Sequence, residues 1–196
     1  MTNQSHSDSC SGHDSCNAQN SKAERSLMDS LPDRHLIRIL MCEHQEIRSR
    51  LDELEKLADE ISLGETERSK TLTRMGSIGE QLVAAEPHHQ REEKILFPEL
   101  ESRGVSGPTQ VMLSEHVSIR KLKHFIADES KRLLTTEEAP TKIIAAAREL
   151  VAELRGHINK ENGVLYPMSL GVIRDQSLWD QMLTRSDEIG YCCTDQ

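Results

Sequence analysis

The chain has 196 residues, which is enough for one domain with a sizeable core but too few for two large ones. Its formal net charge is −9, and without a basic stripe we exclude a nucleic-acid-binding surface and docking on an anionic membrane. Aromatic residues make up only 3% of the sequence, so the largely aliphatic composition favours helix over sheet and predicts an all-α protein. The first thirty residues lack an apolar signal core, and no apolar run has the ~20 residues of a membrane span, so we expect a cytoplasmic protein.

Residues 1–24 are rich in Ser, Asn, Asp and Gly and have almost no large apolar side chain. Such a segment buries too little surface to offset its ordering entropy, so we predict a disordered tail ahead of one domain over residues 25–196. The tail also carries four candidate metal ligands: His6, Cys10, His13 and Cys16. Its composition is nevertheless more typical of a linker than of a metal site.

Apolar residues at three- and four-residue steps then predict a series of helices. In chain order, helices are expected over residues 32–64, 65–104 and 107–134, from Pro140 past Met168, and over 177–190. Gly64 ends the first of these, and Pro87 introduces a kink or a break into the second. Four long helices joined by short loops are most simply packed as an up-down-up-down four-helix bundle, with the short fifth helix at its C-terminal end.

Two motifs each occur twice along these helices. Positions 88–98 read HHQREEKILFP and positions 157–167 read HINKENGVLYP, so the pattern His-x-x-x-Glu-x-x-x-Leu-aromatic-Pro is repeated. Positions 43–48 and 115–120 repeat the pattern Glu-His-x-x-Ile-Arg, each time on the helix before a His-x-x-x-Glu helix. The chain therefore contains two similar helix pairs.

Each helix pair contributes three polar residues to the apolar faces of its helices. The full set is His44, His88, Glu92, His116, His157 and Glu161. A single inward histidine is more often a satisfied core residue, but two matching sets of buried groups would cost several kcal/mol per group without a partner. The most economical compensation is a pair of metal cations, each bound by two histidines and both bridged by the two glutamates. Imidazole and carboxylate ligands with vacant positions favour iron.

Neighbouring residues compete for two of these roles. His89 and Glu93 directly follow His88 and Glu92 and have the same spacing. The repeat aligns His88 with His157, and we therefore expect His89 and Glu93 to lie nearer the edge of the bundle.

Further residues occupy matched positions in the two halves: Glu43 with Glu115, and Phe97 with Tyr166. The glutamates can support the ligand histidines or relay protons, although a residue about 100° around the helix usually meets solvent or a neighbouring helix. The aromatic rings can wall off a gas-sized pocket, but core packing before a helix-ending proline is the favoured interpretation. Near the C-terminus, we expect Cys192 and Cys193 to be exposed thiols rather than a redox switch.

At these motifs the sequence resembles the hemerythrin-like family, also called HHE cation-binding domains, over roughly residues 33–191. It is similar to the hemerythrin domains of PAS-linked bacterial proteins and to di-iron proteins that repair iron centres. The resemblance implies a four-helix bundle whose six residues hold two non-haem iron ions with an oxo or hydroxo bridge. Oxygen-carrying hemerythrin has a further histidine four residues after the position of His116, where this chain has Arg120, so both metals are expected to keep open positions.

Open positions on ferrous iron bind O₂ or NO, and a site rich in neutral imidazole favours the ferrous state. The leading hypothesis is a gas-binding protein that acts in gas or redox sensing, or in protection or repair of iron centres, rather than an enzyme. One alternative is an iron-handling enzyme, such as a ferroxidase or a binuclear metal hydrolase. Another is an interaction module in which the metal only holds the bundle together and the helix around Trp179 docks a protein partner.

Overall fold

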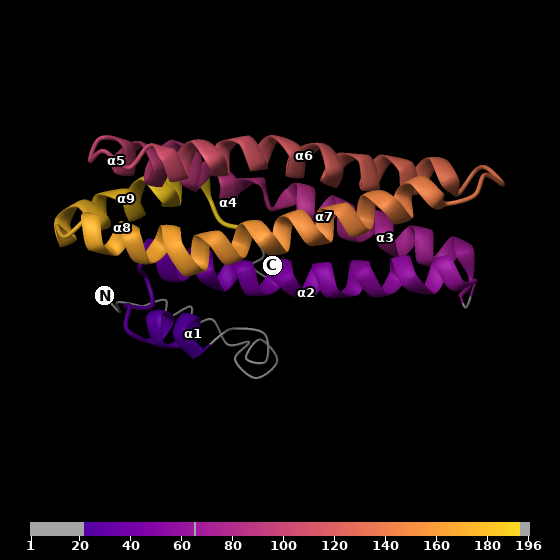
Figure 1. Ribbon diagram of the computed structural model, residues 1–196, viewed down its shortest axis with the longest axis horizontal. Helices are drawn as coiled ribbons and strands as arrows, with labels where there is room; N and C mark the ends of the chain where they lie inside the picture. Colours follow the sequence, from indigo (N-terminus) through magenta and orange to yellow (C-terminus); the bar gives the residue numbers. More distant parts are fainter. Residues whose placement is uncertain (1–21, 65, 193–196) are drawn as a thin grey trace, which may run out of the picture.

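A computed structural model describes residues 22–64 and 66–192, and within these ranges the chain forms helices and no strand. Four long rods run side by side in alternating directions, which confirms the all-α bundle (Figure 1). The first rod is α2 (Leu36–Leu63), and the third is α6 (Gly107–Leu133). None of the described helices combines the length and apolar character needed to cross a bilayer.

The second and fourth rods are each built from several segments. The second consists of α3 (Arg68–Ala84), α4 (Glu86–Arg91), the π-helix η2 (Glu92–Leu96) and α5 (Phe97–Glu101). The fourth consists of α7 (Thr141–Lys160), the π-helix η3 (Glu161–Leu165) and α8 (Tyr166–Val172). The break expected at Pro87 is present, because α3 ends at Ala84 and Pro87 lies in the first turn of α4.

The prolines of the repeated motif do not end their helices, which corrects the favoured interpretation of that motif. The helical path continues past Pro98 in α5 and past Pro167 in α8. A proline ring normally clashes with the carbonyl one turn earlier. Here each proline follows a π-helix, whose wider i→i+5 turn gives the ring room.

Helix α2 begins at Leu36 rather than at Pro32, because His35 caps it. The His35 side chain accepts a hydrogen bond from the Ile37 N–H through Nδ1, over 3.2 Å. The helix ends as expected at Gly64, whose φ of 70° is the left-handed conformation that favours glycine. The fifth helix of the prediction corresponds to α9 (Gln176–Ile189), which Gly190 follows.

A short helix, α1 (Lys22–Asp29), precedes the bundle and overlaps the segment predicted to be disordered. Residues 22–24 are therefore helical rather than part of the tail. Glu24 is only 9% exposed, and it accepts two hydrogen bonds from the Arg48 guanidinium of α2. Residues 1–21, with their four candidate metal ligands, lie outside the described residues.

The core consists of two apolar clusters along the bundle axis. The first packs residues such as Leu51, Leu72 and Ile126, and the second packs residues such as Leu40, Leu96 and Met182. On α2 the boundary between the clusters falls between Met41 and Ile47, and on α6 between Met112 and Ile119. These boundaries contain His44 and His116, so a buried polar layer separates the two clusters.

Candidate metal centre

The six residues predicted from the repeat converge in this polar layer. Each of them is at most 1% exposed. Potential ligand atoms of His44, His88, Glu92 and Glu161 lie within 4.8 Å of one another. A second group within the same limit joins Glu92 and Glu161 to His116 and His157. Because both glutamates belong to both groups, the layer offers two adjoining cation positions.

Each glutamate lies between a histidine of one group and a histidine of the other. Glu161 places Oε2 3.2 Å from His44 Nε2 and Oε1 3.1 Å from His157 Nε2. Glu92 places Oε2 3.6 Å from His88 Nε2 and 3.5 Å from His116 Nε2. Glu161 therefore presents one oxygen to each group, whereas Glu92 presents a single oxygen to both.

The local sequence explains how each glutamate reaches the centre. His88 and Glu92 are four residues apart, as are His157 and Glu161, so each pair lies on one helix face. Each glutamate is also the first residue of a π-helix, and its carbonyl accepts the N–H of the residue five positions later, Phe97 or Tyr166.

The outer nitrogen of every histidine in the set has an acceptor on another helix. His88 Nδ1 lies 2.8 Å from Glu43 Oε2, and His157 Nδ1 lies 2.8 Å from Glu115 Oε2. The Glu of each Glu-His motif therefore supports the histidine of the following His-x-x-x-Glu motif. Such a bond turns Nε2 toward the centre.

The remaining two histidines use the residue directly after Glu92 or Glu161. His44 Nδ1 lies 2.8 Å from Asn162 Oδ1, and His116 Nδ1 lies 2.7 Å from Glu93 Oε1. Sequence reasoning missed this role, although Glu93 and Asn162 stand at matched positions and both can accept a hydrogen bond.

Both ends of the described chain also reach this network. Asn162 Nδ2 donates to Glu24 Oε1 of α1 over 3.0 Å. The Cys192 N–H donates to Glu43 Oε1 over 3.1 Å. Cys192 is 5% exposed, so the expectation of an exposed thiol was wrong for this residue, because its chain segment folds back onto α2; Cys193 lies outside the described residues.

Tyr166 does more than pack in the core. Its hydroxyl donates to Glu92 Oε1 over 2.7 Å, and burial together with the charges of Glu161 and Glu92 raises the pKa of Tyr166 well above its usual range. Phe97, its counterpart in the other half, is 1% exposed and has no hydroxyl to donate. The carboxylates of Glu92 and Glu161 therefore have different surroundings.

Glu92 and Glu161 lie close enough for the charge of one carboxylate to change the pKa of the other. Burial and the charge of Glu161 raise the pKa of Glu92 well above its usual value. Burial also opposes ionisation of Glu161, but the charge of His157 outweighs it and lowers the pKa of Glu161 well below its usual value. Two carboxylates this close disfavour each other's ionised form, and a cation bound between them would favour it in both.

Burial lowers the pKa of several imidazoles of the layer, although the pKa of His157 is raised by Glu161 and Glu115. Burial lowers the pKa of His88 to about 4, against the opposing effect of Glu43. It also lowers the pKa of His116, and it lowers the pKa of His89 well below the ordinary value. A neutral imidazole is the form that binds a metal.

The layer contains unsatisfied acceptors that fit a bound cation. Glu92 Oε2 and both carboxylate oxygens of Glu161 are buried, and none has a hydrogen-bond partner among the described residues. Such groups are costly to bury unless something compensates them. The donor set of imidazole nitrogen and carboxylate oxygen suits iron.

A family model described as the Hemerythrin HHE cation binding domain matches residues 35–169, which include all six residues of the set. The chain belongs to this family.

The hemerythrin-like domain also has curated relatives. The iron-sulfur cluster repair protein YtfE of Edwardsiella ictaluri is 29% identical over 170 residues, which are 74% of this chain and 73% of the relative. The protein of the same name from Salmonella typhimurium is 36% identical over 89 residues, which are 42% of this chain and 40% of that protein. The chain thus aligns with most of the first relative and with less than half of the second.

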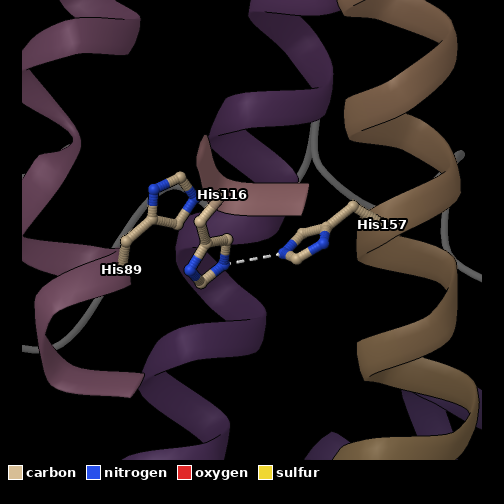
Figure 2. A group of neighbouring side chains, drawn as sticks. All are labelled: His89, His116 and His157. Atoms are coloured by element: carbon tan, nitrogen blue, oxygen red, sulfur yellow. Dashed lines mark hydrogen bonds between the residues drawn. The ribbon is translucent and has the colours of Figure 1, made fainter. Parts of the chain in front are cut away.

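One residue of this hemerythrin-like domain lies where the sequence did not predict it. His89 is 4% exposed, and its ring stacks on that of His116 with 3.9 Å between the centroids (Figure 2). Its expected place at the bundle edge was therefore wrong. The residue matched to His89 in the second half is Ile158, which is fully buried, and this apolar counterpart was the signal that the position faces inward. The side chain of Glu93 is 21% exposed and lies nearer the edge, as expected.

Proposed function

We propose that this chain is a non-haem di-iron protein that binds NO or O₂ and acts in the protection or repair of iron centres. In this proposal His44 and His88 bind one iron, His116 and His157 bind the other, and Glu92 and Glu161 bridge them. The observation that carries the proposal is the pair of overlapping ligand groups that share both glutamates. The relatives named as iron-sulfur cluster repair proteins support the choice of repair.

The bound irons would supply reversible one-electron chemistry and vacant positions for a diatomic ligand. The chain's own residues hold that site in shape. Glu43 and Glu115 orient two imidazoles through Nδ1, and the Tyr166 hydroxyl fixes one oxygen of Glu92. The proposal also places the protein in the cytoplasm.

Metal content and the optical spectrum test the di-iron part of the proposal. We expect the aerobically purified chain to bind about two irons and to absorb in the near ultraviolet as an oxygen-bridged diferric pair. Glu161→Gln removes a bridging charge and should lower iron content below about one per chain. The exposed residue Glu149 of α7 gives a matched control, because Glu149→Gln should leave iron content unchanged.

Recovery of a damaged iron-sulfur enzyme tests the repair part. An iron-sulfur dehydratase inactivated by NO should regain activity when the iron-loaded chain is added, and Glu161→Gln should fail to restore it. A chain that binds two irons and rapidly consumes Fe²⁺ and O₂, yet restores no activity, would favour the ferroxidase alternative.

A further inference from the structure

A carboxylate-binding site lies where α2 meets the fourth rod. Arg48 of α2 donates to both carboxylate oxygens of Glu24, over 3.2 and 3.0 Å, and Asn162 of η3 donates to Glu24 Oε1 over 3.0 Å. Arg48 also donates to Oδ1 of Asn159 of α7 over 2.9 Å, which fixes the guanidinium in place. A fixed guanidinium beside an amide is a donor set that recognises a carboxylate. We call Arg48, Asn159 and Asn162 together the Arg48 site.

The carboxylate in the Arg48 site belongs to α1, which lies outside the four rods (Figure 1). The family match begins at residue 35, so α1 precedes the matched domain, whereas the Arg48 site lies within it. The buried residues of α1 are Glu24 and Met28, and a helix of eight residues is marginal in water on its own. Because α1 depends on its contacts with the bundle, a ligand that offers a carboxylate can compete with Glu24.

A cavity next to this carboxylate gives a ligand room. It has a volume of about 630 Å³, which is the size of a typical small-molecule site. Glu24, Arg48 and Asn162 line it, as do the apolar side chains of Leu27 and Pro167. A ligand whose carboxylate replaced that of Glu24 would therefore place its remaining atoms in the cavity.

The charges that line the cavity indicate the remaining groups of the ligand. Arg155 and Asp52 also line it, and they form an ion pair over 2.6 Å in which the side chains are 33% and 39% exposed. An ammonium next to a carboxylate, as in an α-amino acid, matches such a pair in both signs. Glu24 contributes one negative charge to the cavity, so a ligand that replaces it preserves the charge balance when its own net charge is −1.

We propose that the Arg48 site binds a small molecule in which an α-amino acid group is joined to one further carboxylate, and that Glu24 occupies this site until the ligand displaces it. The further carboxylate accepts hydrogen bonds from Arg48 and Asn162 in place of Glu24. The α-amino acid group pairs with Asp52 and Arg155, and helix α1 then separates from α2. The inference is independent of the proposed iron binding, because none of the proposed metal ligands takes part in it.

Equilibrium dialysis of the full iron-loaded chain tests the site with two radiolabelled probes, L-glutamate and γ-L-glutamylglycine, which carry the same groups at different lengths. The wild-type chain should bind one molecule of the better probe, and the ranking of the two probes separates a free amino acid from a short peptide. Glu24→Ala should bind that probe at least about tenfold more tightly, because it removes the competing carboxylate. L-Glutamine, which lacks the further carboxylate, should not displace the probe.

Two further variants control for the identity of the site. Arg48→Met in the Glu24→Ala background should abolish binding without leaving a buried charge unpaired. Glu53→Ala is the matched control, because Glu53 of α2 accepts two hydrogen bonds from Arg74 and neither residue lines the cavity. Its affinity for the probe should equal that of the wild-type chain.

Trypsin cleavage reports whether the ligand displaces α1. Cleavage after Arg25 of α1 should accelerate about tenfold in the presence of the better probe and should be unchanged with L-glutamine. A Glu24→Ala chain that binds neither probe would overturn the inference, as would binding that survives Arg48→Met. Binding without faster cleavage would overturn the displacement of Glu24. Iron content and the near-ultraviolet spectrum of the same samples assess the proposed function separately.

Discussion

Glu43 and Glu115 hold matched positions in the two halves, yet their burial differs. Glu43 is 5% exposed and forms an ion pair with Arg91, which is fully buried. The side chain of Glu115 is 28% exposed, and its ion-pair partner Lys160 is 47% exposed. Both carboxylates support a histidine of the centre, but only Glu43 also compensates a charge that water cannot reach.

This difference predicts unequal costs of substitution. Glu43→Ala should lower the free energy of unfolding by about 3–5 kcal/mol, because it leaves the Arg91 guanidinium buried without its partner. Glu115→Ala should cost less than about 1 kcal/mol, because Lys160 is resolvated. Each change should weaken iron binding about 10- to 100-fold by releasing an imidazole. Urea unfolding of the iron-free variants and competition with an iron chelator measure the two effects.

A second substitution separates the buried charge from the lost support. In the Glu43→Ala background, Arg91→Met should recover most of the stability but none of the iron affinity. Equal unfolding costs for Glu43→Ala and Glu115→Ala would contradict the argument.

At the scale of residues, the repeat contained the information for most of the site. Matched motifs identified six inward polar residues because duplication places equivalent side chains at equivalent depths. The burial of His89 escaped this reasoning because its counterpart in the other half is the apolar Ile158. The roles of Glu93 and Asn162 also escaped it, because a hydrogen bond between distant helices leaves no local spacing to detect.

The two π-helices are the elements that shape the centre. One begins at Glu92 and the other at Glu161, and each ends just before an aromatic-proline pair. The extra residue in the wide turn shifts the glutamate relative to the rest of its rod. The helical segments on either side still turn their apolar faces toward the core. Val164 lies in η3 and is 54% exposed, so it contributes little to the core.

Deletion of Val164 tests the role of this turn. The segment should close to an ordinary α-helical turn, so the free energy of unfolding should stay within about 1 kcal/mol of the wild-type value. Iron affinity should nevertheless fall at least about tenfold, because Glu161 and Asn162 shift relative to their partners. Val164→Ala, which keeps the residue count, should bind iron normally. If the deletion variant retained two irons and the wild-type spectrum, the π-helix would have no role in the site.

At the scale of elements, apolar periodicity predicted the long helices and Pro87 predicted the break in the second rod. The π-helices were not predicted, because one inserted residue changes the spacing of the apolar residues too little to distinguish a π-helix from a regular α-helix. The matched prolines were the available signal, but a proline in isolation indicates a helix end. Helix α1 was missed because its stability comes from distant partners such as Arg48, not from its own composition.

At the scale of the whole molecule, the second and third rods of the bundle pack closely against each other. Gly79 of α3 faces Ala127 of α6, and a Cβ atom added at Gly79 would lie 2.8 Å from the backbone nitrogen of Ala127. Gly156 of α7 has no atom within 4 Å of the corresponding position among the described residues. A side chain at position 79 would therefore clash with α6, whereas a side chain at position 156 would meet no neighbouring atom among the described residues.

Alanine substitution at the two positions should change stability in opposite directions. Gly79→Ala should cost about 1–3 kcal/mol, because the helices must separate and this outweighs the gain in helix propensity. Gly156→Ala should add about 0.5–1 kcal/mol, because only the propensity term applies. The urea midpoint at constant slope measures both changes. Stabilisation by Gly79→Ala would show that the rods can move apart at no cost.

Helix α1 and Cys192 are far apart in the chain, but both are linked to the imidazole pair of His44 and His88, α1 through the Glu24 carboxylate and Cys192 through that of Glu43. Glu24 holds Asn162 against His44, and the Cys192 N–H holds Glu43 against His88. Removing α1 or Cys192 would therefore take away the outer support of a ring deep inside the bundle. The colour of the iron-loaded protein would consequently report whether a preparation still contains both α1 and Cys192.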